Sequence, residues 1–171
     1  MFQFKPGRVD LAIIRQDAVP TGANTAMVMK MRFHLCIPRA LLKRGATERD
    51  AASPALWQTL AFAAGRDGGQ TDTAVREAMQ SAGVDFRPRF ECGSMLQVRQ
   101  LVELGACAGI LPTLGIRGLD EKKVLITPFA PLRDFGRALV LHWNPRQMRR
   151  RGLETADLKK LAAIIADQSK A

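Results

Sequence analysis

The sequence predicts an α/β protein with two lobes, one of them a compact lobe around a small parallel sheet. Residues 60–111 have the pattern strand, helix, strand, helix, strand, with apolar residues at helical spacing in both helices. Further strand-like runs flank this segment, at residues 9–14, 33–37, 124–127 and 138–143. We expect the flanking runs to pair with each other as the second lobe, joined to the first by two crossings.

The most informative stretch, residues 87–112, predicts a strand, a tight turn, a helix and another strand. Gly93 permits a sharp turn, and Ser94 followed by Gln97 has the spacing of a capping box. In such a box the serine oxygen accepts from an amide of the first turn, and the glutamine side chain accepts from the free amide of the serine. The apolar run 106–111 is typical of a strand covered on both faces, as in a parallel sheet. Ser94 therefore begins a helix directly after a strand.

The preceding unit repeats this arrangement. Residues 60–64 predict a strand, residues 65–69 a flexible turn, and a helix follows that is capped near Thr71 or Thr73 and ended by Gly83. Right-handed crossovers place both helix starts at the carboxyl edge of one sheet, where open parallel sheets bind ligands.

The other segments are read more simply. A loop runs through residues 20–24, a short helical piece follows at 39–43, and the polar segment 45–54 is a candidate lobe boundary. The chain closes with an amphipathic helix at residues 156–168, for which Thr155 is a suitable cap.

Composition narrows the class of protein. The 171 residues are 47% hydrophobic, no apolar run approaches the roughly 18 residues that span a bilayer, and the start is not built like a secretory signal, so we expect a cytoplasmic globular protein without membrane association. Cys36, Cys92 and Cys107 lie in apolar runs without a Cys-x-x-Cys pair, which favours buried, reduced thiols over metal ligands or disulfides.

The formal net charge of +10 raises the question of nucleic acid binding. The chain has no tyrosine and only 6% aromatic residues, and no basic run alternates with rings that could stack on bases, which argues against a dedicated binding face. The densest basic cluster, residues 146–151, is predicted to be a solvated loop; the alternative is weak, salt-sensitive attraction to polyanions.

Catalytic motifs are incomplete. A nucleophile elbow around Ser94 would need glycines two residues before and after it, where the chain has Cys92 and Leu96. The glycine-rich turn at residues 65–71 lacks the lysine of a phosphate loop, and no cluster has metal-ligand spacing. We expect no catalytic residue, no metal and no cofactor.

The order of segments resembles a known family. VDLAII at residues 9–14, FHLCIP at 33–38, VRQLVELGACAGILP at 98–112, KVLITP at 123–128 and ALVLHW at 138–143 together resemble the carboxy-terminal effector-binding domain of LysR-type transcriptional regulators. The resemblance implies the fold of type 2 periplasmic binding proteins, with two α/β lobes built on parallel sheets, a two-strand hinge and a cleft for a small effector, often an organic anion.

The resemblance also implies domain limits. Lobe I would comprise residues 1–38 and 128–171, and lobe II residues 39–127, with residues 33–38 and 124–128 close to the two hinge crossings.

Four residues follow from the resemblance as effector-binding residues near the cleft: Arg15, Gly65, Arg66 and Ser94. The residues themselves favour the same chemistry, because a helix start at Ser94 and guanidinium groups that follow strands suit a carboxylate, sulfate or phosphate. The alternative is that Ser94 merely caps its helix. The expected partner is a small organic anion.

The chain departs from the family pattern at its start. The helix-turn-helix domain and linker helix of such regulators are missing, and only eight residues precede the strand at 9–14, so we expect an amino-terminally truncated, incomplete first lobe. An open strand edge there favours a homo-oligomer. The alternatives are a fragment of a solute-binding protein of the same fold and a small anion-handling α/β enzyme.

We expect the chain to show no sequence-specific DNA binding, because the segment that reads the major groove is missing. Gel shifts against competitor DNA at physiological salt test this, since attraction due to charge alone fades as salt rises. A specific complex that survives these conditions would contradict the prediction.

Overall fold

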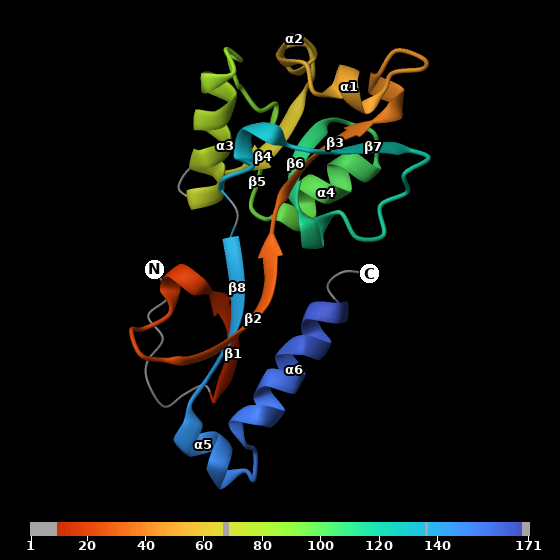
Figure 1. Ribbon diagram of the computed structural model, residues 1–171. Coiled ribbons are helices and arrows are strands. Elements are labelled where there is room, and N and C mark those ends of the chain that lie inside the picture. Colours follow the sequence, from red (N-terminus) through yellow and green to blue (C-terminus); the bar gives the residue numbers. More distant parts are fainter. Residues whose placement is uncertain (1–9, 67–68, 136, 169–171) are drawn as a thin grey trace. The chain divides into compact units, whose positions relative to one another are not determined.

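A computed structural model describes residues 10–66, 69–135 and 137–168 (Figure 1). The chain forms two compact units: unit 1 extends to Met31 and resumes at Arg137, and unit 2 is Arg32–Gly136. The lobe limits expected at residues 38 and 128 both fall inside unit 2. Val9 of the first predicted strand and residues 67–68 of the predicted turn lie outside the described residues.

Unit 2 is built on a sheet with the strand order β5-β4-β6-β3-β7. Its strands are β3 (Phe33–Pro38), β4 (Phe62–Gly65), β5 (Phe90–Cys92), β6 (Ala108–Pro112) and β7 (Val124–Pro128). Strand β4 is parallel to both β5 and β6, which confirms the two predicted crossover units. Strand β3, however, is antiparallel to β6 and to β7, so the sheet is mixed rather than parallel throughout.

The helices of unit 2 are α1 (Glu48–Ala51), α2 (Pro54–Trp57), α3 (Gln70–Ser81) and α4 (Met95–Glu103), with 3-10 turns at Arg39–Leu41, Thr113–Gly115 and Ala130–Leu132. Helices α3 and α4 pack on opposite faces of the sheet, because alternate residues of β3 enter different cores. Leu35 and Ile37 join the core of α3, whereas Cys36 joins that of α4. The result is a three-layer unit with both faces covered.

Two local predictions for unit 2 are wrong. Helix α3 is capped by Gly69, without a side-chain bond, rather than by Thr71 or Thr73. The polar segment at residues 45–54, expected to be a loop and lobe boundary, contains α1 and lies within unit 2. A capping box starts α1, in which Thr47 Oγ1 accepts from the amide of Asp50 and the Asp50 carboxylate accepts from the amide of Thr47.

Helix α4 lies unusually close to strand β6 at Gly109. A β-carbon on this glycine would stand 2.8 Å from Val98 Cγ1 and 3.0 Å from Val102 Cγ2. Both valines are buried on the inner face of α4. Because any side chain at position 109 would push the helix away, Gly109 fixes the distance between α4 and the sheet.

Unit 1 contains a separate sheet in the order β1-β8-β2, formed by β1 (Leu11–Arg15), β2 (Asn24–Met31) and β8 (Arg137–Trp143). Both pairings are antiparallel, in contrast to the parallel sheet expected for this lobe. Strand β2 was missed, because its segment was read partly as a loop. Its register against β8 shifts between Met27 and Met29.

The helices of unit 1 follow β8. They are α5 (Pro145–Arg150) and α6 (Thr155–Gln168), and a 3-10 turn, Gln16–Ala18, follows β1. Helix α6 supplies Leu158 and Ala162 to a core that also contains Leu141, Trp143 and Met148. The predicted last helix is therefore confirmed, although Thr155, expected to be its cap, is its first helical residue. The basic segment expected to be a loop forms α5. Within the described residues, every helix is too short or too polar to cross a membrane.

Replacing Gly109 by alanine should destabilise unit 2 by roughly 1–3 kcal/mol, the usual cost of overpacking a core. The free energy of unfolding from urea titrations measures this. Gly93→Ala is the matched control, because a β-carbon there meets only Gln97 Oε1 at an ordinary 3.5 Å. Equal stability of the two variants would show that α4 can shift away from the sheet at little cost.

Candidate functional site

The carboxyl edge of β4 and β5 brings two predicted site residues together in unit 2. Gly65 pairs with Cys92 in parallel register, and the amide of Arg66 donates to the carbonyl of Cys92 at 3.1 Å. Arg66 and Ser94 thus leave the ends of adjacent strands, which are about 5 Å apart. Both residues are exposed. The sequence argument correctly placed them on one edge.

Ser94 begins helix α4 as predicted. Its Oγ accepts from the amide of Gln97 at 3.3 Å. The predicted capping box would require the Gln97 side chain to accept from the Ser94 amide. Instead, Gln97 Oε1 accepts from the amide of Gly93 at 2.7 Å. Since a hydroxyl that accepts one bond still has its own proton to donate, Ser94 can serve both the helix and a ligand.

Gly65 is less open than its position suggests. It is buried, and the space beside its α-carbon is filled by the carboxylate of Asp72, whose Oδ1 would stand 2.3 Å from an added β-carbon. Asp72 lies in the first turn of α3 and also approaches Gly69, the cap of that helix. A carboxylate at the positive end of α3 offsets the attraction for an external anion there. Of these two helix starts, only that of α4 lacks an acidic residue in its first turn.

The reversed direction of β3 adds residues that sequence reasoning missed. Because β3 begins where β6 ends, Arg32 lies beside Thr113: the Thr113 amide donates to the Arg32 carbonyl at 2.9 Å, and the Arg32 amide donates to Thr113 Oγ1 at 3.1 Å. His34 Nε2 lies 3.5 Å from Thr113 Oγ1. Arg32 itself is exposed at this edge.

His34 is electrostatically unusual. Partial burial, and secondarily the positive charge of Arg32, lower the pKa of the His34 imidazole. The ring is therefore neutral at neutral pH and can act as a hydrogen-bond donor or acceptor without carrying charge. The strand-like sequence around His34 did not predict this, because it did not reveal that β3 begins at the carboxyl edge, with Arg32 and His34 beside Thr113.

Arg15, the remaining predicted residue, belongs to unit 1. It ends β1, and its Nε donates to Asp17 Oδ1 at 3.0 Å. The other oxygen of Asp17 accepts from Arg137 Nη1 at 2.8 Å, so two guanidinium groups share one carboxylate. That Arg15 takes part in the same site as Arg66 and Ser94 stays a prediction.

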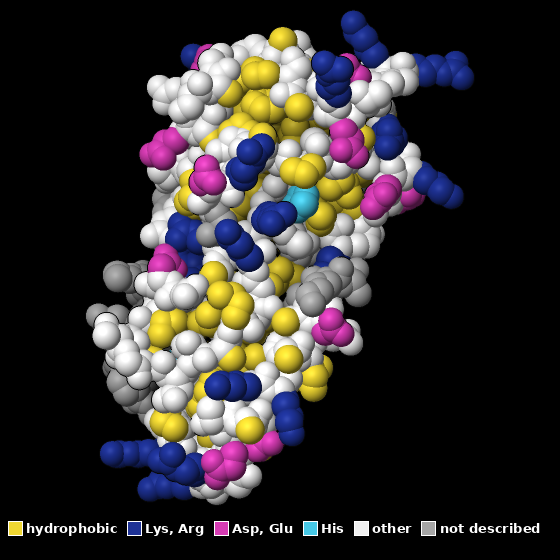
Figure 2. Space-filling model, in the orientation of Figure 1, with side chains coloured by type: hydrophobic (Ala, Val, Ile, Leu, Met, Phe, Trp, Pro, Cys, Tyr) yellow, Lys and Arg dark blue, Asp and Glu magenta, His cyan; other side chains and the backbone are white. Residues whose placement is uncertain are grey.

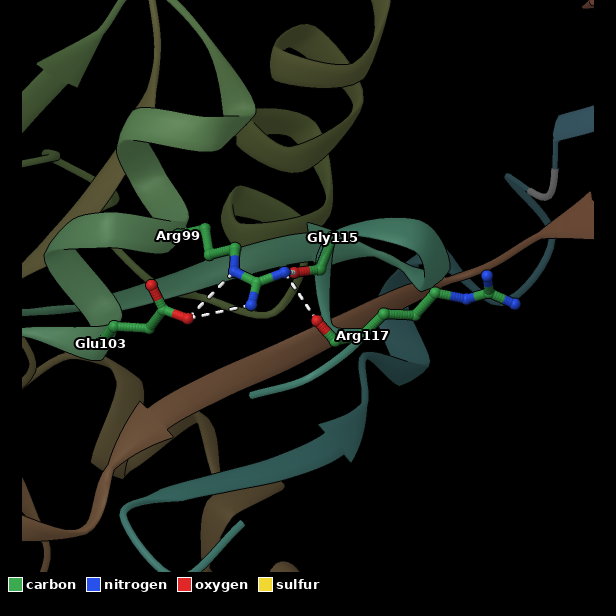
Figure 3. A network of polar contacts seen from close by, with 4 residues as sticks. All are labelled: Arg99, Glu103, Gly115 and Arg117. Atoms are coloured by element: carbon green, nitrogen blue, oxygen red, sulfur yellow. Dashed lines mark hydrogen bonds and ion pairs between the residues drawn. The ribbon is translucent and has the colours of Figure 1, made fainter. Parts of the chain in front are cut away.

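A polar network holds the chain that leaves β6 against helix α4 (Figure 3). Arg99 on α4 donates through Nη2 to Glu103 Oε1 at 2.9 Å and through Nη1 to the carbonyl of Arg117 at 2.6 Å. The carbonyl of Gly115 lies 3.4 Å from the same Nη1. Because Thr113 immediately precedes this bound segment, the network helps to fix the end of β6 relative to α4.

A surface pocket of about 210 Å³ lies elsewhere in unit 2, lined by Glu103, Gly118, Asp120, Lys123 and Val124. Val124 begins β7, which runs parallel to β6, so the pocket lies toward the opposite edge of the sheet from Ser94. Its two carboxylates already have partners, namely Arg99 for Glu103 and the amide of Lys122 for Asp120. The pocket is also smaller than most ligand sites.

The three cysteines are buried and unpaired, as predicted. Burial raises the pKa of the Cys36 thiol from 9.0 to about 12 and that of Cys107 to about 11, and it also raises the pKa of Cys92. In the part of the chain that the structure describes, no three His, Cys, Asp or Glu side chains are grouped as metal ligands would be.

The chain passes from one α/β unit to the other and back, and each unit has its own sheet. This architecture is that of a type 2 periplasmic-binding-protein-like domain. The chain belongs to the LysR substrate binding domain family, whose profile matches residues 3–156. This confirms the family resemblance and the α/β fold class. A search of curated proteins gave no match.

Several solved structures of regulators have a similar fold. The reduced form of OxyR from N. meningitidis has a TM-score of 0.58 and 20% identity, covering 94% of this chain and 71% of that one. The reduced OxyR regulatory domain from Pseudomonas aeruginosa has a TM-score of 0.60 and 18% identity, covering 94% and 73%. HinK, a LysR family transcriptional regulator from the same organism, has a TM-score of 0.58 and 20% identity, covering 95% of this chain but only 55% of its own.

We expect the native thiols to react slowly with iodoacetamide near neutral pH, because the thiolate is the reactive form. The shift of the Cys36 pKa from 9.0 to about 12 lowers its thiolate fraction by roughly a thousandfold. Mass spectrometry of alkylated protein, with and without urea, measures this. Ser94→Cys provides an exposed thiol at a helix start as the positive control, and rapid native alkylation of Cys36 would contradict the prediction.

Proposed function

We propose that this chain is the ligand-sensing regulatory domain of a LysR-family regulator, and that the carboxyl edge of β4 and β5 in unit 2 binds a small organic anion. The observation that supports the proposal is the exposed start of α4 at Ser94, directly beside the end of β4 at Arg66. A helix start offers free amides and a partial positive charge, which together favour a carboxylate.

The charges at this edge favour an anion over a neutral ligand. Arg66 and Arg32 are both exposed, and Arg66 forms no ion pair with the described residues. A guanidinium binds a carboxylate through two parallel hydrogen bonds, so Arg66 can hold one end of a ligand whose other contacts are the amides and hydroxyl at Ser94. Among the described residues, the Asp72 carboxylate lies near the end of β4, where it is packed against Gly65.

Apolar contacts at the same edge favour an organic ligand over an inorganic ion. Leu96, in the first turn of α4, is 63% exposed, and Leu114, which follows Thr113, is 42% exposed. Leu96 is two residues after Ser94, and Leu114 directly follows Thr113. A ligand with a carboxylate and a hydrocarbon portion could therefore bury apolar surface in addition to its charge.

Ser94→Ala tests the site. We expect it to lower stability by about 1 kcal/mol through loss of the cap, and to weaken binding of a short carboxylate by a further roughly 1–3 kcal/mol. The probes are a panel of short mono- and dicarboxylates, with the matching primary amides as neutral ligands. Calorimetry measures affinity, and thermal melting of the same samples measures stability.

Thr47→Ala is the matched control, because Thr47 caps α1 by the same kind of bond as Ser94 caps α4. It should lower the melting temperature and leave carboxylate affinity unchanged. If Ser94→Ala behaves in the same way as Thr47→Ala, Ser94 is only a helix cap and the proposed site is wrong. Preference for the amides over the carboxylates would show that the effector is not anionic.

A further inference from the structure

Helix α5 in unit 1 presents an arginine-rich face. Arg146, Arg149 and Arg150 are spaced at i, i+3 and i+4, which places them on one side of the helix with β-carbons about 5–6 Å apart. All three are exposed. Met148, in contrast, is 3% exposed and packs into the core with Trp143 and Leu158. The helix therefore has one anchored side and one basic side.

The helix is held firmly despite its short length. Asn144 caps it, with Oδ1 accepting from the amides of Arg146 and Gln147 at 3.1 and 3.4 Å, and the Asn144 amide donates to the carbonyl of Asp10 beside β1. Arg151 forms an ion pair with the carboxylate of Asp10. The three arginines are thus displayed on a fixed element rather than on a flexible loop.

Their charges are not neutralised within the described residues. Arg146, Arg149 and Arg150 make no ion pair there, while the Asp10 carboxylate pairs with Arg151 and the Asp157 carboxylate accepts from the amide of Glu154. Figure 2 shows dark blue side chains gathered at the end of unit 1 that carries α5. A local excess of arginine on a chain of net charge +10 gives a positive field focused on this face.

We propose that the α5 face, defined by Arg146, Arg149 and Arg150, binds the phosphate backbone of duplex nucleic acid without reading its sequence. Guanidinium groups pair bidentately with phosphates, and three of them on one helix face can engage successive backbone phosphates. This activity goes beyond effector sensing and does not depend on it.

Other polyanions fit the face less well. A membrane-bound amphipathic helix inserts apolar side chains, but the apolar residue of α5, Met148, is buried in the protein. Single-stranded nucleic acid is gripped by aromatic stacking, and no aromatic residue is among the exposed large hydrophobic side chains of the described residues. A fixed helix face of guanidinium groups, with no exposed aromatic ring beside it among the described residues, suits the outside of a duplex.

The salt dependence of binding tests the proposal. The probe is a fluorescent duplex of arbitrary sequence, titrated with the full chain across a range of salt concentrations. Replacing Arg146, Arg149 and Arg150 together by glutamine should reduce the slope of log affinity against log salt by about 0.9 for each lost phosphate contact, or about 2.7 in all. The corresponding triple lysine variant should keep most of the slope, because it retains the charge.

The control removes the same charge elsewhere. Arg44, Arg49 and Arg133 are exposed residues of unit 2 without ion pairs to the described residues, and their replacement by glutamine should leave the slope nearly unchanged. Equal loss in the two glutamine variants would assign binding to overall charge and overturn the proposal. So would an unchanged slope in the α5 variant with a native melting curve, or tighter binding of the chain to anionic lipid vesicles than to the duplex.

Discussion

The close approach of helix α4 to strand β6 is the contact on which the candidate site depends. Val98 and Val102 occupy the space that a side chain at Gly109 would need, so the helix axis is set by contact with the backbone of β6. With the helix fixed in this way, its first residue lies at the end of β5, beside the end of β4. The position of Ser94 therefore follows from the packing of Val98 and Val102, about one and two helical turns further along α4.

The direction of β3 determines which charged groups join that edge. A parallel β3 would begin at the opposite edge, and Arg32 would be remote from Ser94. The antiparallel pairing seen here places Arg32 next to Thr113, and the hydroxyl of Thr113 is consumed by bonds to the Arg32 backbone. Thr113 thus joins the end of β6 to the start of β3 through hydrogen bonds, whereas the Arg32 side chain is exposed and adds positive charge at this edge.

Local signals in the sequence predicted local structure well. The crossover pattern, the cap at Ser94 and the glycines that end α3 and α4 were all readable, because each depends on residues close together in the chain. The features that were missed depend on distant partners or on competing signals. Residues 146–151 were read as a loop, although the preceding asparagine and proline are typical of a helix start. The contact of the Asp72 carboxylate with Gly65 depends on how α3 packs against the sheet, which the local sequence does not show.

The two proposed anion-binding features use positive charge in physically different ways. At Ser94 the proposed donors are backbone amides and a hydroxyl aligned by the helix, and Arg66 adds one exposed guanidinium, so binding there should respond less to salt than binding on α5. On α5 the donors are exposed guanidinium groups, and the Debye length of about 8 Å at physiological salt screens them strongly. If both proposals hold, the chain of net charge +10 combines a site that selects a small carboxylate by geometry with a surface that attracts a polyanion by charge density.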